Sequence, residues 1–186
     1  KIDTVLEYVV AAIYFSIVLT SLFSWVIPYF LPPQYSNIQY LLAICLLGPL
    51  LYTLSEVTGI GIAVVRRTKF SMLCAIVAML CSSILNYFLV PQFGAAGAAI
   101  STAVAFFIFF ILRTEISQLV WRKKSHLKVF LIMLSLLIIS SLNLLLEQFR
   151  VEIYFLLTGM FFFGFILFNK IVKEILQKIS FFRLFG

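Results

Sequence analysis

The chain has 186 residues, of which 63% are hydrophobic and only 11% are charged. A typical soluble domain is about 45–50% apolar and about 25% charged, so this chain has too few polar side chains to cover a globular surface. The composition excludes a soluble enzyme, a disordered chain and a small disulfide scaffold. It predicts an all-α integral membrane protein.

The net charge of +7 has a simple explanation in such a protein. Cytoplasmic loops of membrane proteins are enriched in lysine and arginine, so the excess does not indicate a nucleic-acid partner. The cysteines, Cys45, Cys74 and Cys81, lie inside apolar runs without Cys-x-x-Cys spacing, which indicates neither a metal site nor a disulfide framework. Because the chain begins with Lys1 and shows no signal peptide, we expect it to be a piece of a longer protein.

Six apolar runs are long enough to cross a bilayer, which takes about 20 residues. They extend over residues 5–30, 38–65, 70–90, 94–112, 129–146 and 151–168. Together they predict a polytopic helix bundle in which residues 1–169 form one membrane lobe. The pair Gly48-Pro49 predicts a kink within the second run. The third run is expected to stop at Pro91, and residues 113–128 are expected to form a basic loop.

The basic residues fall on one side of this six-span arrangement. Every lysine and arginine except Arg150 lies in the segments that share a membrane face with Lys1. Since this excess marks the cytoplasmic side, both termini are expected in the cytoplasm. The opposite connections are too short to form a folded external domain. Residues 170–186 alternate apolar and polar positions at helical spacing, which predicts a cytoplasmic amphipathic tail on the membrane surface.

The chain lacks the residues that common enzyme sites require. It contains one aspartate, Asp3, and one histidine, His126. No Asp-x-Asp pair, no His-Glu-x-x-His zinc motif and no phosphate-binding loop is present in the sequence. We therefore expect no enzyme activity, no catalytic residue, no metal and no cofactor.

Glu56 is the most informative single residue because it lies well inside the second apolar run. A carboxylate that faces lipid at such a place costs at least about 2–3 kcal/mol on insertion scales. Two interpretations remain open. Glu56 lines a cavity, where it could couple transport to a cation or proton, or it reaches the inner interface beside Arg66 and Arg67. Asn86, one turn before Pro91, either bonds between helices, caps carbonyls freed near the proline, or lines a substrate pathway.

Small residues recur every four positions at the start of the fourth run. One stripe joins Gly94, Ala98 and Thr102, and the other joins Gly97, Ser101 and Ala105. Such stripes let helix backbones approach closely in lipid, where no hydrophobic drive brings helices together. The pattern predicts a helix-packing role for Gly94, Gly97, Ala98 and Ser101.

Arg66, Arg67 and Lys69 form a basic cluster between the second and third runs. Its simplest role is to set topology and to contact anionic lipid. Clustered cations at a membrane surface also concentrate anions, so a role in recruiting a phosphate headgroup remains open beside it.

Three sequence blocks resemble a known family. They read GIGIA at 59–63, RRTK at 66–69 and LNYFLVPQFGAAGAAIST at 85–102, and LPPQY at 31–35 adds a similar turn. The chain resembles the C-terminal half of bacterial O-antigen or capsular polysaccharide flippases of the Wzx type, in the multidrug/oligosaccharidyl-lipid/polysaccharide (MOP) superfamily. The resemblance covers residues 1–120 well and the last two runs loosely.

The resemblance implies a twelve-span transporter with two lobes, of which this chain would be the second. Such proteins move undecaprenyl-pyrophosphate-linked oligosaccharide units across the bacterial cytoplasmic (inner) membrane for polysaccharide and lipopolysaccharide biosynthesis. The implied partners are this substrate, the bilayer, the N-terminal half of the transporter and the polysaccharide polymerase machinery. The family's cavity is cationic, whereas Glu56 is the only clear intramembrane charge here, so the cations are expected mostly from the other half.

Two other functions remain open beside the flippase. A cation-coupled drug exporter of the related MATE branch would share the fold, with Glu56 binding the coupling ion. A non-transport scaffold of a glycan-assembly complex would need neither a pathway nor a coupling ion.

Overall fold

The computed structural model describes residues 2–30, 32, 38–121, 126–145, 150–169, 171 and 173. These residues form helices and, within the described ranges, no strand. The elements are α1 (Ile2–Leu22), the 3-10 helix η1 (Ser24–Tyr29), α2 (Ile38–Thr58), α3 (Ile60–Val64), α4 (Thr68–Phe93), α5 (Ala95–Val120), α6 (Leu127–Leu145) and α7 (Arg150–Leu167).

Five helices, α1, α2, α4, α5 and α6, are long and apolar enough to cross a membrane. This confirms the prediction of an all-α, multi-pass membrane protein. The sixth predicted run forms α7, whose apolar part, Glu152–Leu167, is shorter than the other five. Among the described residues, the predicted six spans are therefore five long helices and one shorter apolar helix.

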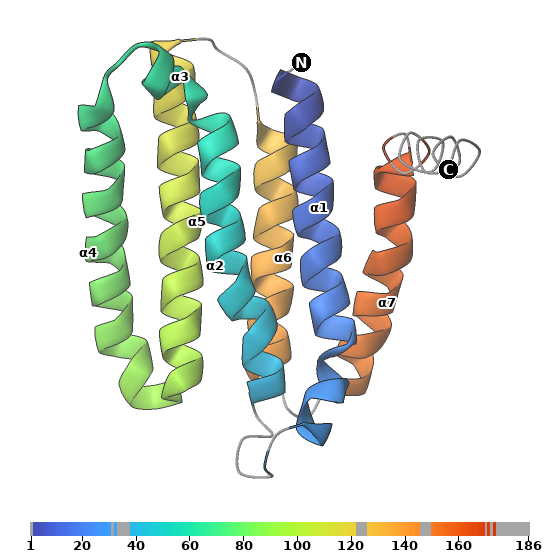
Figure 1. The fold of residues 1–186 in the computed structure, drawn as a ribbon. Coiled ribbons are helices and arrows are strands. Elements are labelled where there is room, and N and C mark those ends of the chain that lie inside the picture. Colours follow the sequence, from blue (N-terminus) through green and yellow to red (C-terminus); the bar gives the residue numbers. More distant parts are fainter. Residues whose placement is uncertain are drawn as a thin grey trace.

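The long helices stand in a row, and their directions alternate along the chain (Figure 1). The helices α4 and α5 lie at one edge, while α1 and α7 contact each other at the other edge. Between these edges, α2 contacts α1, α5 and α6. The start of α1, the end of α7 and the α3–α4 turn all lie at one end of the bundle. We call it the basic end, because the turn carries Arg66, Arg67 and Lys69.

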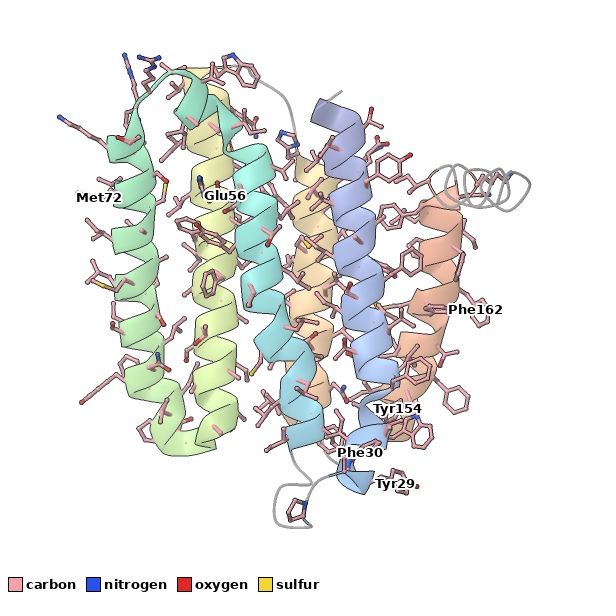
Figure 2. The ribbon with its side chains drawn as sticks, viewed as in Figure 1. Tyr29, Phe30, Glu56, Met72, Tyr154 and Phe162 are labelled. Carbon is pink, nitrogen blue, oxygen red and sulfur yellow. The ribbon has the colours of Figure 1, made fainter. Side chains whose placement is uncertain are left out.

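The core consists of apolar side chains from the central helices. They include Ile17 and Val18 of α1, Leu47, Leu51 and Leu54 of α2, Phe110 of α5 and Met133 of α6. The edge helices differ, since Cys74 is the one buried residue that α4 contributes among the described residues. Met72 of α4 and Phe162 of α7 point away from the bundle at its two edges (Figure 2). In a bilayer these outer faces meet lipid or another chain.

Three element boundaries differ from the sequence prediction. The second run is broken at Gly59 into α2 and α3, and Figure 1 shows a bend in α2, the helix that contains Pro49. The helix α4 continues through Pro91 to Phe93, because a proline in the last turn removes one backbone bond without ending the helix. The helix α5 continues to Val120, so residues 113–120 belong to a helix and not to the predicted loop.

Some predictions fall outside the described residues. The amphipathic tail expected at 170–186 lies outside them except for Ile171 and Lys173. So do residues 122–125 of the predicted basic loop, and the turn at 31–37 apart from Pro32. The fold that positions the candidate site is formed by α2, α3, α4 and α5, which are described throughout.

Candidate functional site

Polar residues gather where the last turn of α2 and all of α3 pack against α5, near the basic end. We call this region the polar seam, and its members are Ser55, Glu56, Thr58, Gly59, Gly61, Arg113, Thr114 and Ser117. Elsewhere these helices meet through apolar side chains such as Leu51 and Phe110. The seam is therefore a local departure from the apolar packing of the bundle.

An ion pair between Glu56 and Arg113 is the main feature of the polar seam. Nη1 of Arg113 donates to Oε1 of Glu56 at 2.5 Å, and Nη2 donates to Oε2 at 2.8 Å. Nη1 also lies 3.3 Å from the hydroxyl of Ser55, and the guanidinium sits 5.6 Å from the ring centre of Phe109. The Arg113 side chain is 12% exposed and the Glu56 side chain 48%. The bidentate pair is thus electrically neutral, with an enclosed cation and an accessible carboxylate.

Hydroxyl groups continue the polar seam toward the end of α5. The hydroxyls of Thr58 and Thr114 lie 2.7 Å apart, and Thr114 is fully buried. The Gly61 amide donates to the hydroxyl of Ser117 at 3.0 Å. These bonds join α2 and α3 to α5 at fixed positions along the helices, because hydrogen bonds between helices require a particular register.

Two glycines allow the backbones to approach closely in the polar seam. A Cβ atom at Gly59 would lie 2.7 Å from Nε of Arg113. A Cβ atom at Gly61 would lie 2.6 Å from the Ser117 hydroxyl and 2.8 Å from the Ser117 carbonyl oxygen. Since real Cβ atoms do not approach other atoms so closely, any side chain here would push α3 away from α5.

The structure changes the sequence-based interpretation of Glu56. The carboxylate is paired with Arg113 of α5, and not with Arg66 or Arg67. Arg113 was assigned to a basic loop, and this prediction was wrong, because Arg113 lies within α5. Glu56 was taken as the only clear intramembrane charge, and its partner Arg113 belongs to another helix long and apolar enough to span a membrane. The available signal was the helical spacing of Phe110, Thr114 and Ser117, which continues the buried face of α5 past residue 112.

The basic cluster lies where α3 gives way to α4, with Arg66 and Arg67 in the connecting turn and Lys69 in the first turn of α4. All three residues are exposed, and Arg66 has a φ of 57° that few residues other than glycine adopt. The cluster therefore lies at the same end of the bundle as the polar seam (Figure 2).

The residues of the small-residue stripes have two different roles, because some pack between helices and one forms a turn. At Gly97 a Cβ atom would collide with the carbonyl oxygen of Leu89, so α4 and α5 approach closely there. Ser101 is buried and donates to the Gly97 carbonyl at 2.6 Å, while Ala98 is half-buried. Gly94, expected to pack between helices, has no heavy atom within 4 Å of its Cβ position. It forms the α4–α5 turn with a φ of 55°, which glycine adopts readily.

Asn86 does not reach another helix in the bonds that the structure shows. Its amide Nδ2 donates to the Ser82 hydroxyl of the same helix at 3.3 Å. Ser82 in turn lines a pocket between α2, α4 and α5. The structure therefore keeps Asn86 apart from Glu56, with which it had been grouped as a pathway residue, and places it beside that pocket instead.

Neither a similar known protein nor a group of metal-binding side chains in the described residues indicates a function for this site. No family model, no curated protein and no solved structure matches the chain. Within the part of the chain that the structure describes, no group of three or more His, Cys, Asp or Glu side chains could hold a metal ion. A function must therefore be argued from the polar seam, the basic cluster and the helical architecture.

Proposed function

We propose that the chain is one lobe of a bacterial inner-membrane flippase for undecaprenyl-pyrophosphate-linked oligosaccharide units. The observation that carries the proposal is the Glu56–Arg113 ion pair inside a bundle of apolar helices. Ionisable groups are rare in such helices and usually mark a substrate or ion pathway. The sequence blocks at 59–63, 66–69 and 85–102 add the resemblance to polysaccharide flippases.

The charges suggest an order of events at the basic end. Arg66, Arg67 and Lys69 are exposed and would attract the pyrophosphate group by electrostatics. Arg113 is held by Glu56, so its guanidinium would bind a phosphate only by exchanging one anionic partner for another. A Glu56 carboxylate released in this exchange would take up a proton, because an unpaired charge in the membrane is costly. Proton uptake would thereby be coupled to substrate binding.

The lobe needs a second half to enclose a pathway. A twelve-span transporter would supply it from the N-terminal half of the same protein, and further cations for the substrate would come from there. The basic end would face the cytoplasm, where the lipid-linked units are assembled, since cytoplasmic loops carry the excess of lysine and arginine. This orientation also puts both the start of α1 and the end of α7 on the cytoplasmic side.

The test is deletion of the full gene in its native host, followed by complementation with single variants. Deletion should remove the surface glycan ladder on a gel and leave undecaprenyl-linked units inside the cell. Glu56→Gln should reduce ladder formation at least tenfold at an unchanged protein level, because glutamine keeps the shape and cannot exchange a proton. Glu152→Gln on the exposed first turn of α7 is the matched control and should restore export. Normal export by Glu56→Gln would remove Glu56 from the mechanism.

The half-exposed carboxylate of Glu56 also favours a second candidate, a cation-coupled drug exporter. The same deletion strain separates the two functions. An intact glycan ladder together with increased drug susceptibility would support the exporter and contradict the flippase. An intact ladder, unchanged susceptibility and co-purification of a glycosyltransferase would support a scaffold instead.

A further inference from the structure

A pocket of about 380 Å³ lies between α2, α4 and α5, one helical turn from the ion pair. Its volume falls in the range of small-molecule sites, about 300–1,000 Å³. The pocket exists because Ala75 and Ala78 of α4 face Ala105 of α5 across it, and these small side chains leave the space open. The function proposed above does not use this pocket.

Aromatic rings form one wall of the pocket. Tyr52 and Phe109 stack with ring centres 5.9 Å apart and planes inclined by 11°. Phe106 meets Tyr52 edge-on at 6.5 Å, and its ring also fills the space beside Gly48. Flat ring faces of this kind favour contact with an apolar ligand body.

Hydroxyl oxygens lie on the other side of the pocket. Ser83 donates its hydrogen to the Met79 carbonyl at 3.0 Å, and Thr102 donates to the Ala98 carbonyl at 2.9 Å. A hydroxyl that has given its hydrogen to its own helix still has lone pairs that accept. Ser83 and Thr102 therefore present acceptors to a ligand, which favours a ligand that donates hydrogen bonds.

The pocket opens on the outer surface of the bundle, where Ser83 of α4 and Thr102 of α5 are exposed. The exposed side chains on the outside of α4, such as Met72, Leu80 and Phe88, are apolar. Ser82 and Ser83 line the pocket and make this part of the surface polar, and Ser83 is itself exposed. A hydrocarbon chain would leave the spare lone pairs of Ser83 and Thr102 without a donor, whereas an alcohol would supply one.

The pocket is also uncharged. None of its lining side chains carries a charge, and the nearest ion pair in the described chain, Glu56 with Arg113, is satisfied internally. We propose that this pocket binds an uncharged alcohol with an apolar body, its hydroxyl donating to Thr102 and its body resting on Tyr52 and Phe109. This inference stands whether or not the protein is a flippase.

The test is photolabelling of the full-length protein in phospholipid nanodiscs. The probe is a long-chain alcohol with a diazirine beside the hydroxyl end, and its controls are the hydrocarbon and the carboxylic acid of the same length. We expect the alcohol to label peptides containing Tyr52 or Met79 at least about threefold more than either control, the factor that corresponds to one typical hydrogen bond in a membrane. Equal labelling by all three probes would overturn the proposal and identify a lipid groove.

Two variants test whether the alcohol binds in this pocket and which hydroxyl accepts its hydrogen bond. Thr102→Val should reduce labelling by the alcohol about threefold and leave labelling by the hydrocarbon unchanged. Thr158→Val is the matched control, because Thr158 is exposed on α7 and donates to its own helix at 2.8 Å in the same way. Ala78→Phe should block the pocket and reduce labelling by every probe, provided that its melting temperature matches the parent protein. Undiminished alcohol labelling in Thr102→Val would contradict the assigned acceptor.

Discussion

The polar seam and the α1–α7 contact join neighbouring helices by different means. At the polar seam, α5 is joined to α2 and α3 through the Glu56–Arg113 pair, the Thr58–Thr114 hydroxyls and the Gly61–Ser117 bond. At the other edge, α1 meets α7 and the residue that follows it through one bond from the Tyr14 hydroxyl to the Met160 carbonyl and through aromatic rings, which belong to Tyr14, Phe15, Phe161, Phe165 and Phe168.

The difference shows that the polar seam fixes how far one helix is shifted along another, whereas the α1–α7 contact mainly supplies buried apolar area. Aromatic rings tolerate small shifts of one helix along another, because the attraction is spread over many atoms. A bidentate ion pair and a backbone bond next to a glycine do not tolerate such shifts. An uncompensated charge in the membrane is also costly. Removing one partner of the ion pair should therefore lower the free energy of unfolding more than removing one contact between α1 and α7 does. The following variants test this contrast from the largest expected effect to the smallest.

Arg113→Met should give the largest loss of stability. The change leaves the Glu56 carboxylate without its partner, and we expect the free energy of unfolding to fall by about 2–3 kcal/mol. Arg113→Lys keeps the charge without the bidentate geometry and should lose less. Titration with SDS in mixed micelles measures both. A loss below about 0.5 kcal/mol for Arg113→Met would mean that the pair does not stabilise the fold.

Gly61→Ala should have a smaller but clear effect. The added Cβ would lie 2.8 Å from the Ser117 carbonyl oxygen, which belongs to the backbone and cannot turn aside. Overpacking of this kind costs about 1–3 kcal/mol. Gly159→Ala on α7 is the matched control, since nothing lies within 4 Å of its Cβ position. Similar melting temperatures for the two variants would contradict the close approach of α3 to α5.

Tyr14→Phe should have the smallest effect of the three. It removes the 2.8 Å bond to the Met160 carbonyl and keeps the ring against Phe15 and Phe168. Hydrogen bonds between membrane helices contribute about 0.6 kcal/mol on average. Tyr87→Phe, on the exposed face of α4, should change nothing measurable in the same titration. A loss for Tyr14→Phe as large as that for Arg113→Met would remove the contrast between the two contacts.

The membrane architecture could be predicted from the sequence, because long apolar runs are a local property. The exception is the sixth run, since α7 is apolar over fewer residues than the other helices. Glu56 could also be singled out locally, as a charge within an apolar run. The boundaries near Gly59 and Leu112 were missed because contacts between helices decide them.

The polar seam itself could not be predicted from local patterns. Arg113 follows an apolar run and precedes further polar residues, which is also how a loop begins. Its ion-pair partner, Glu56, lies 57 positions earlier in the chain, beyond the reach of any local pattern. Gly94 was misassigned for a related reason, since a small residue at helical spacing serves either a helix contact or the turn before it. Its φ of 55° and the lack of any heavy atom within 4 Å of its Cβ position distinguish the two roles.

A double-mutant cycle between Glu56 and Arg113 tests the central claim most directly. The free energies of unfolding of Glu56→Gln, Arg113→Met and the double variant are measured by SDS titration against the parent protein. If the ion pair joins α2 to α5, the double variant should be more stable than the sum of the single losses predicts, with a coupling energy of at least about 1 kcal/mol. Strictly additive losses would show that the two side chains do not interact, and would contradict the polar seam as described here.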